Sequence, residues 1–211
     1  MLILGADEAG KGPVLGSMFV AGLVIDEEKL FDLASLGVRD SKQLTPSRRE
    51  VLAKKISRIA HDQYILEVSP QVIDELRSVM TMNDLMVRSF AQVLQKLQAD
   101  KAILDAADVN EERFAAKVKS ASKSSMSIMA EHKADQRHQV VSAASILAKV
   151  RRDESIRELE RLHNCKMGSG YPSDSDTIKF LEEWVKDKKE LPPFARHTWA
   201  TAKRIIEASF I

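Results

Sequence analysis

The sequence is poor in cysteine and has no long apolar run. Its single cysteine, Cys165, can form neither an internal disulfide nor a zinc site made of several cysteines, which agrees with a reducing compartment. No apolar stretch is long enough to cross a bilayer. The apolar start of the chain is short and meets the acidic pair Asp7 and Glu8 too early for a secretory signal. We therefore expect a cytoplasmic protein without a membrane partner.

The overall charge does not identify a partner, because acidic and basic residues are unevenly distributed. A length of 211 residues with 44% hydrophobic and 30% charged residues suits one globular domain with a small appendage. The formal net charge is only +1, so a face that binds a phosphate backbone would have to be local. Solvated helix faces explain any one basic cluster at least as well. The clusters are Arg48 with Arg49, Lys54 with Lys55, Lys149, Arg151 with Arg152, and residues 186–189.

Apolar periodicity and end signals predict an α/β fold. Two apolar runs separated by a glycine-containing turn predict a β-hairpin at the start of the chain. Thr45 followed by Pro46 has the residues of a helix N-terminus. Strands that then alternate with helices predict a mixed sheet flanked by helices, with a helical C-terminal appendage. Strands are expected at 2–6, 17–25, 64–68, 101–105 and 126–130, and helices at 46–60, from 70 onward, and at 83–97, 110–120, 139–163, 177–187 and 198–208.

The stretch Gly5-Ala6-Asp7-Glu8-Ala9-Gly10-Lys11-Gly12-Pro13 resembles two nucleotide-binding motifs, and we reject both. A P-loop requires Ser or Thr where Gly12 stands, and it tolerates no acidic pair at the phosphates. The strand expected at 17–25 occupies the place of the phosphate-binding helix. The same missing helix counts against a dinucleotide-binding turn.

The third interpretation of this stretch is a metal site, because hard cations such as Mg²⁺ prefer carboxylate oxygens. Asp105 ends one predicted strand, and Asp135 follows another. Carboxyl ends of strands gather beside the ligand crevice of an α/β sheet, so these acids and Asp7 can share one site. Taken singly, an acid at a strand end such as Asp105 or Asp135 is more often a helix cap or a turn former, although Asp108 is the better cap candidate.

Several ordered motifs resemble those of the ribonuclease HII family, and the likeness spans nearly the whole chain. The opening acid-glycine motif and the His-Lys-Ala-Asp segment look closest to its archaeal branch. Lys11 stands where the bacterial pattern often has Arg, a change of little consequence because the backbone performs the role. The motifs are Asp7-Glu8-Ala9-Gly10-Lys11-Gly12, Asp40-Ser41-Lys42, Leu104-Asp105, His132-Lys133-Ala134-Asp135, Ala143-Ala144-Ser145 and Gly168-Ser169-Gly170-Tyr171.

The resemblance implies a ribonuclease H-like catalytic domain over 1–165, with a helical region over 166–211 packed on it. It implies an endonuclease that hydrolyses the RNA strand of RNA/DNA hybrids and cuts at ribonucleotides embedded in duplex DNA. The products would carry 5′-phosphate and 3′-hydroxyl ends, and the cellular role would be removal of RNA primers and misincorporated ribonucleotides.

The implied catalytic groups are four metal-binding carboxylates, with Asp7 as the bridging ligand and Glu8, Asp105 and Asp135 completing the shells. Two Mg²⁺ or Mn²⁺ ions about 3.5 to 4 Å apart would activate the attacking water and neutralise the leaving oxygen. Neighbouring strand side chains point to opposite faces, so we expect the chain to turn at Ala9 and Gly10. Without metal, mutual repulsion should raise the pKa values of these carboxyls.

Substrate recognition is expected from backbone groups at Gly10, Lys11 and Gly12, which approach the 2′-OH closely because no bulky side chain intervenes. Tyr171 resembles the family's tyrosine that stacks beneath the neighbouring deoxyribose; a packing anchor is the alternative. By the same resemblance Lys42, Lys133 and Lys149 contact phosphates, although solvated lysines explain them too. A metal site needs no general base, so His132 is left as an ordinary hydrogen-bonded histidine.

The expected partners are RNA/DNA hybrids and duplex DNA that contains ribonucleotides. The final residues, 206–211, resemble a tail that binds a sliding clamp, and we expect a monomer. The competing class is a non-catalytic nucleic-acid-binding module whose acids are structural. Dependence of strand scission on divalent ions separates the two classes.

Overall fold

The computed structural model describes residues 1–38 and 44–209, and these residues form two compact units. Unit 1 comprises Met1–Ala9, Phe19–Leu66 and Met82–Arg151, and unit 2 comprises Gly10–Met18, Glu67–Thr81 and Arg152–Ile211 as far as they are described. The division of the chain at residue 165, expected from the sequence, stays a prediction. Within the described ranges, no helix is both long enough and apolar enough to span a membrane.

A mixed sheet forms the centre of the fold, as predicted. Its strand order is β3-β2-β1-β4-β5. β1 pairs with β2 in antiparallel fashion, which is the expected hairpin, whereas β4 runs parallel to both β1 and β5. The strands are β1 (Leu2–Ala9), β2 (Met18–Asp26), β3 (Asp62–Val68), β4 (Lys101–Asp105) and β5 (Ser127–Glu131).

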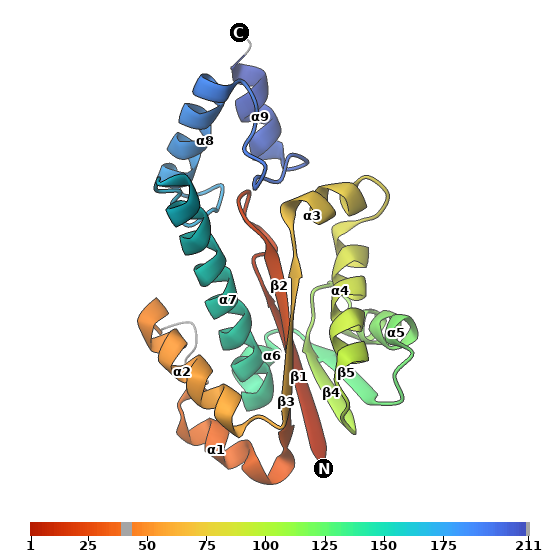
Figure 1. Cartoon of the computed structure of the whole chain (residues 1–211). Helices are drawn as coiled ribbons and strands as arrows, with labels where there is room; N and C mark the ends of the chain where they lie inside the picture. Colours follow the sequence, from red (N-terminus) through yellow and green to blue (C-terminus); the bar gives the residue numbers. More distant parts are fainter. Residues whose placement is uncertain (39–43, 210–211) are drawn as a thin grey trace. The chain divides into compact units, whose positions relative to one another are not determined.

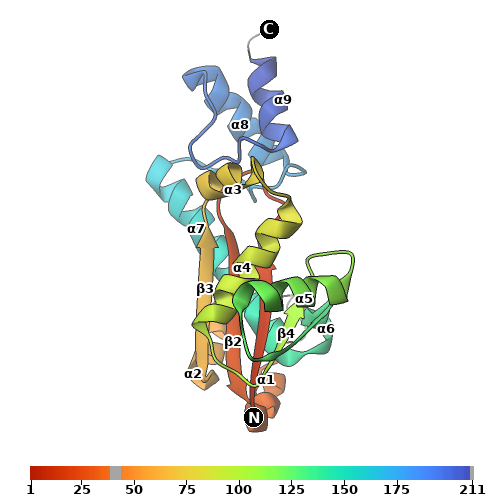
Figure 2. The same cartoon turned by 90° about the vertical axis from the view of Figure 1, so that its right-hand side faces the viewer.

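In unit 1, helices cover both faces of the sheet (Figures 1 and 2). Gly5 pairs with Leu23, and a Cβ on Gly5 would lie only 2.4 Å from the carbonyl carbon of Val140, so this face packs against α7. The next residue pair faces the other way, and a Cβ on Gly22 would lie 2.5 Å from the side chain of Val93 in α4. One face carries α1 (Leu30–Ser35), α2 (Pro46–Ile59), α6 (Ala134–Arg137) and the first half of α7 (Gln139–His163), and the other carries α4 (Met82–Lys96) and α5 (Glu111–Ser122).

The predicted end signals locate several helices correctly. Thr45 accepts a hydrogen bond from the amide of Arg48 and caps α2, and Ser69 caps α3 (Pro70–Arg77) in the same way. The short helices η1 (Glu27–Lys29), α1 and α6 were not predicted, because so few residues carry no measurable periodicity. β1 also continues to Ala9, beyond its predicted end at 6, because Asp7 and Glu8 keep their pairing with β2.

Unit 2 contains α3, the second half of α7, α8 (Ser175–Lys188) and α9 (Ala200–Ala208), as far as the structure describes it. Its core is apolar and partly aromatic: the ring centroids of Trp184 and Phe194 lie 5.6 Å apart, and those of Phe180 and Trp184 lie 5.8 Å apart. α8 begins two residues before its predicted start at 177, because Asp174 accepts a hydrogen bond from the amide of Asp176 and caps the helix there.

Candidate functional site

Three of the four predicted carboxylates lie together in unit 1. Asp7 and Glu8 come from β1 and Asp105 from the end of β4, and one oxygen of each lies within 4.8 Å of the others. Asp135 does not belong to this group at that distance, among the residues that the structure describes. The structure therefore brings together an acidic cluster of Asp7, Glu8 and Asp105.

The strand register explains why Asp7 and Asp105 meet. β1 and β4 are parallel, with Gly5 beside Ile103 and Ala6 beside Leu104, so the next position along the sheet sets Asp7 beside Asp105. Alternation along the strand puts Asp7 on the same face as Gly5, the face that packs against α7. The parallel pairing thus joins two acids that are 98 residues apart in the sequence.

Glu8 joins the cluster although the strand does not turn before Ala9. Ala9 still pairs with Phe19, and the left-handed residue is Gly10, with φ of +88°. Both acids therefore lie within β1, and the chain turns at Gly10, the second of the two positions expected for the turn. The amide of Glu8 donates a hydrogen bond of 2.7 Å to Asp7 Oδ1, which links the backbone of one acid to the carboxylate of the other.

Burial and negative neighbours make the anionic form of Asp7 unfavourable. Asp7 is only 6% exposed. Burial raises the pKa of Asp7 well above its ordinary value, the charges of Glu8 and Asp105 raise it further, and the Ser145 hydroxyl and the amide of Glu8 oppose the shift. The raised pKa that clustered carboxyls were expected to show is found at Asp7.

The acidic cluster suits a hard divalent cation. Oε2 of Glu8 is buried, and no described residue donates a hydrogen bond to this one oxygen. Buried carboxylate oxygens are normally bonded to a donor or a cation. Carboxylate oxygens within 4.8 Å of one another are the ligands that Mg²⁺ and Mn²⁺ prefer. A bound cation would supply the missing interaction and offset the mutual repulsion.

Asp135 lies in the first turn of α6 and is 5% exposed. The amide of the preceding residue, Ala134, donates a hydrogen bond of 2.7 Å to Asp105 Oδ1. Asp105 therefore accepts the first amide of α6, although the N-cap of that helix is Lys133. The prediction of Asp108 as a helix cap is wrong, because Asn110 is the N-cap of α5. Asp108 is structural instead, since it accepts hydrogen bonds from Arg113 and from the amide of Asn110.

In unit 2, Tyr171 lies beside residues 10–12, which we call the Gly10–Gly12 loop. A Cβ on Gly12 would lie 3.7 Å from the tyrosine ring. The amides of Val14 and Leu15 donate hydrogen bonds of 2.8 and 3.2 Å to the carbonyl of Gly170, which ties the two segments together. Tyr171 itself is 40% exposed, so a face of this aromatic residue is accessible to a ligand.

Arg152 is a residue whose role the sequence analysis missed. It was counted in a basic surface cluster, yet it is only 8% exposed. Its guanidinium donates to the carbonyl of Ser169 and lies 5.0 Å from the centre of the Tyr171 ring. Helical spacing could have predicted this burial. Ala148 and Ile156 are apolar, lie four residues to either side of Arg152 on the same face of α7, and are both buried.

The predicted lysines lie in different settings. Lys133 is exposed and left-handed, with φ of +57°, directly before α6. Lys11 and Lys149 are half-buried, and Lys42 lies outside the described residues. Nε2 of His132 lies 3.3 Å from the carbonyl oxygen of Val109, in keeping with the ordinary hydrogen-bonded histidine proposed for it.

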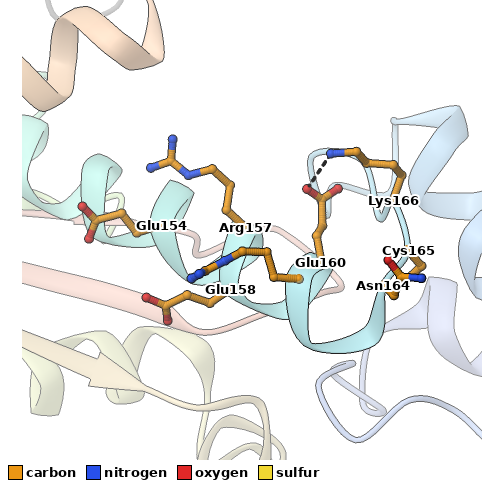
Figure 3. Close-up of a pocket in the computed structure, with 8 residues that line it drawn as sticks. Glu154, Arg157, Glu158, Glu160, Asn164, Cys165 and Lys166 are labelled. Carbon is orange, nitrogen blue, oxygen red and sulfur yellow. Dashed lines mark hydrogen bonds and ion pairs between the residues drawn. The ribbon is translucent and has the colours of Figure 1, made fainter.

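A pocket of about 850 Å³ lies along the charged second half of α7 (Figure 3). Nζ of Lys166 and Oε2 of Glu160 lie 3.3 Å apart at its edge. None of the residues predicted for the site lines it. The lining residues are Glu154, Arg157, Glu158, Glu160, Arg161, Asn164, Cys165 and Lys166.

Comparisons with known proteins agree with this architecture. A family model described as Ribonuclease HII matches residues 4–202. A Ribonuclease HII of Methanothrix thermoacetophila is 57% identical over 209 residues, covering 99% of this chain and 99% of the relative. The crystal structure of the ribonuclease H2 from Pyrococcus horikoshii OT3 matches with a TM-score of 0.94 and 43% identity, over 100% of this chain and 99% of that chain. An RNase HII from Archaeoglobus fulgidus, solved in a complex with PCNA, matches with a TM-score of 0.88 and 37% identity, over 94% of this chain and 95% of that chain.

The mixed sheet and the matching structures define a nuclease with a ribonuclease H-like fold. Within that class, the chain belongs to the ribonuclease HII family and is an endoribonuclease. The family resemblance predicted from the motifs, including its archaeal character, is confirmed.

Proposed function

We propose that this protein hydrolyses the RNA strand of RNA/DNA hybrids and cuts at ribonucleotides embedded in duplex DNA. The observation that carries the proposal is the acidic cluster of Asp7, Glu8 and Asp105 in a chain of the ribonuclease HII family. Its products would be 5′-phosphate and 3′-hydroxyl ends. This activity would remove RNA primers and misincorporated ribonucleotides in the cytoplasm.

The metal ligands in this proposal are Asp7, Glu8, Asp105 and Asp135. Asp7 is buried and lies near both Glu8 and Asp105, which suits a bridging ligand. Asp135 follows Ala134, whose amide contacts Asp105, so α6 brings Asp135 into the neighbourhood of the cluster. Two Mg²⁺ or Mn²⁺ ions, when bound, would activate the attacking water and neutralise the leaving oxygen. The protein's part is to hold the carboxylates in this geometry.

Ribose recognition is assigned to the Gly10–Gly12 loop and Tyr171. Gly10 has a φ of +88°, which a glycine adopts without strain. Gly12 is exposed, and a side chain there would fill space next to the Tyr171 ring. The exposed ring suits stacking on a deoxyribose, and its hydroxyl can bond the neighbouring 2′-OH.

Phosphate contacts and a protein partner complete the proposal. Lys133 is exposed and Lys11 and Lys149 are half-buried, so each can reach a phosphate; Lys42 is included by its motif alone. The relative from Archaeoglobus fulgidus forms a complex with PCNA, which supports a sliding clamp as a partner of the C-terminal tail. Phe210 and Ile211, at the end of that tail, lie outside the described residues. We propose that the enzyme acts as a monomer.

The test compares Asp105→Asn with its neighbour Asp108→Asn on a duplex that contains a single ribonucleotide. We expect Asp105→Asn to lose at least about a thousandfold in kcat, because it removes a negatively charged ligand of the proposed metal ions. The variant should still bind the hybrid. Asp108→Asn should lower stability and keep cleavage, because Asp108 bonds Arg113 and Asn110. Wild-type cleavage should stop in chelator and return with Mg²⁺ or Mn²⁺.

Two results would contradict the proposed function. Near-normal turnover of Asp105→Asn with Mg²⁺ present would remove Asp105 from the metal site. Hybrid binding by the wild type without any strand scission in Mg²⁺ or Mn²⁺ would identify a binding module instead of a nuclease.

A further inference from the structure

Two side chains of unit 2 bind all three carbonyl groups of the Gly10–Gly12 loop. Arg196 donates hydrogen bonds of 2.5 Å to the carbonyl of Gly10 and 2.9 Å to that of Lys11. The indole Nε1 of Trp199 donates one of 3.1 Å to the carbonyl of Gly12. The remaining guanidinium nitrogen of Arg196, Nε, donates a hydrogen bond of 3.1 Å to the carbonyl of Gly16, four residues after the Gly10–Gly12 loop.

Arg196 is a fully buried cation. It is 0% exposed. Burial lowers the pKa of Arg196 to about 10, so it stays protonated at neutral pH. Burying a charge is costly unless hydrogen bonds compensate it. Here all three guanidinium nitrogens donate to backbone carbonyls, two of them in the Gly10–Gly12 loop and the third at Gly16. The arrangement specifies the orientation of the loop's peptide groups.

The hydrogen bonds to the carbonyls also determine the direction in which the loop's amide N–H groups point, because the peptide unit is planar. The described residues contain no cis peptide bond, and in a planar trans peptide the N–H points away from the C=O. With the carbonyls of Gly10 and Lys11 turned toward Arg196, the amides of Lys11 and Gly12 point to the opposite side. The third peptide adds no donor, because residue 13 is proline.

We propose that Arg196 and Trp199 are positioning residues that turn the amides of Lys11 and Gly12 toward the substrate. The proposal rests on the proposed function, and it deepens the assignment of the loop: recognition uses two N–H donors, which bond oxygens of the ribonucleotide sugar and its phosphate. The loop's carbonyls already accept hydrogen bonds from Arg196 and Trp199.

The segment that carries both positioning residues is itself anchored. Asp74 of α3 accepts hydrogen bonds from the amides of His197 and Thr198, at 2.7 and 3.0 Å. The Arg196 guanidinium lies 4.9 Å from the centre of the Trp199 ring. The backbone amide of Arg196 donates a hydrogen bond of 2.8 Å to the carbonyl of Val14. The segment is therefore a rigid support for the loop.

The test is Trp199→Phe, which keeps an aromatic ring and removes the indole donor. The matched control is Trp184→Phe in the same unit, because Nε1 of Trp184 is buried and donates no hydrogen bond to any described residue. On a duplex with one ribonucleotide, we expect Trp199→Phe to raise KM about tenfold, the size of effect that one lost hydrogen bond produces. Trp184→Phe should leave KM unchanged.

The split between KM and kcat separates positioning from mere stabilisation. A residue that only stabilises the fold would reduce the folded fraction, which lowers kcat at constant KM. Arg196→Lys keeps the charge and part of the hydrogen bonding, so it should fall between wild type and Arg196→Met in KM. Unchanged KM in Trp199→Phe and in both Arg196 variants, with a wild type that cleaves normally, would overturn the positioning role. A wild type without cleavage would instead overturn the proposed function.

Discussion

Asp7 shows how a single side chain can be unfavourable for folding and still be suited to binding. It is buried beside two other carboxylates, and its pKa is raised because burial and those charges disfavour the anion. A divalent cation reverses this balance, since it stabilises the anionic form of every acid that it contacts. The cluster should therefore be less stable without metal than with it, and metal binding should release protons.

Substitutions at Tyr171 should separate the contribution of its aromatic ring from that of its hydroxyl. Tyr171→Ala should lose about tenfold to a hundredfold in kcat/KM on a duplex with a single ribonucleotide, because aromatic stacking is lost. Tyr171→Phe should fall between alanine and wild type, since it keeps the ring that Arg152 faces at 5.0 Å and loses only the hydroxyl. Steady-state kinetics on that duplex would measure both. Activity of Tyr171→Ala equal to that of the wild type would exclude Tyr171 from ribose recognition.

At the scale of elements, the packing of β1 on α7 determines where Asp7 lies. Gly5→Ala places a methyl group within 2.6 Å of three backbone atoms of Val140 and Val141. Because backbone cannot move aside cheaply, the substitution should cost about 1 to 3 kcal/mol of unfolding free energy and lower Tm by several degrees.

The control for Gly5→Ala is Gly12→Ala, measured in the same thermal unfolding experiment. Gly12 has no positive φ, and an added Cβ would make an ordinary contact at 3.7 Å. Its stability should stay within about 0.5 kcal/mol of the wild type. Equal Tm values for Gly5→Ala and wild type would show that β1 and α7 do not need this close approach.

Asp174 gives a pH prediction for the segment that joins Tyr171 to α8. Hydrogen bonds from Ser169 and from the amide of Asp176 hold the pKa of Asp174 below its ordinary value. A depressed carboxyl pKa stabilises the fold above the unfolded value of about 3.9, and this stability is lost as the pH falls through the folded pKa. Asp174→Asn should therefore be less stable than wild type at pH 7.

Urea unfolding at pH 7 and pH 3 would measure this difference. Asparagine is an equally good N-cap, so α8 should persist in the variant. The variant loses the charge and, because asparagine has one side-chain oxygen, it also loses one of the hydrogen bonds from the amides of Ser169 and Asp176. Of these two losses, only that of the charge makes the gap in stability depend on pH. The gap between Asp174→Asn and wild type should shrink at the lower pH. A gap of constant size at both pH values would assign the effect to shape and not to charge.

For the whole molecule, a formal charge of +1 makes local basic residues responsible for binding a polyanion. Phosphate contacts release counterions, so the affinity for hybrid should fall steeply with salt, with a log-log slope of about 0.9 per neutralised phosphate on B-DNA and a somewhat different one on a hybrid. Fluorescence anisotropy across a salt series would give the slope. A flat salt response would indicate that the phosphate backbone is not the main contact.

Local sequence determined much of this protein by itself. The bounds of β4 and α7 agree with those predicted. A short apolar run and a long helical periodicity depend only on residues that are close in the sequence, so they can be recognised before the chain folds. The motifs also identified the family and three acids that meet in the acidic cluster. These features depend on residue types and spacings that the chain carries before it folds.

Tertiary structure alone decided which of these residues meet and what surrounds them. Parallel pairing of β1 with β4 set Asp7 beside Asp105, and burial raised the pKa of Asp7. The contact between Arg196 and Gly10 joins residues 186 positions apart. Nothing near Arg196 in the sequence distinguishes a buried arginine from a solvated one, because burial and carbonyl partners come from segments that only folding brings together.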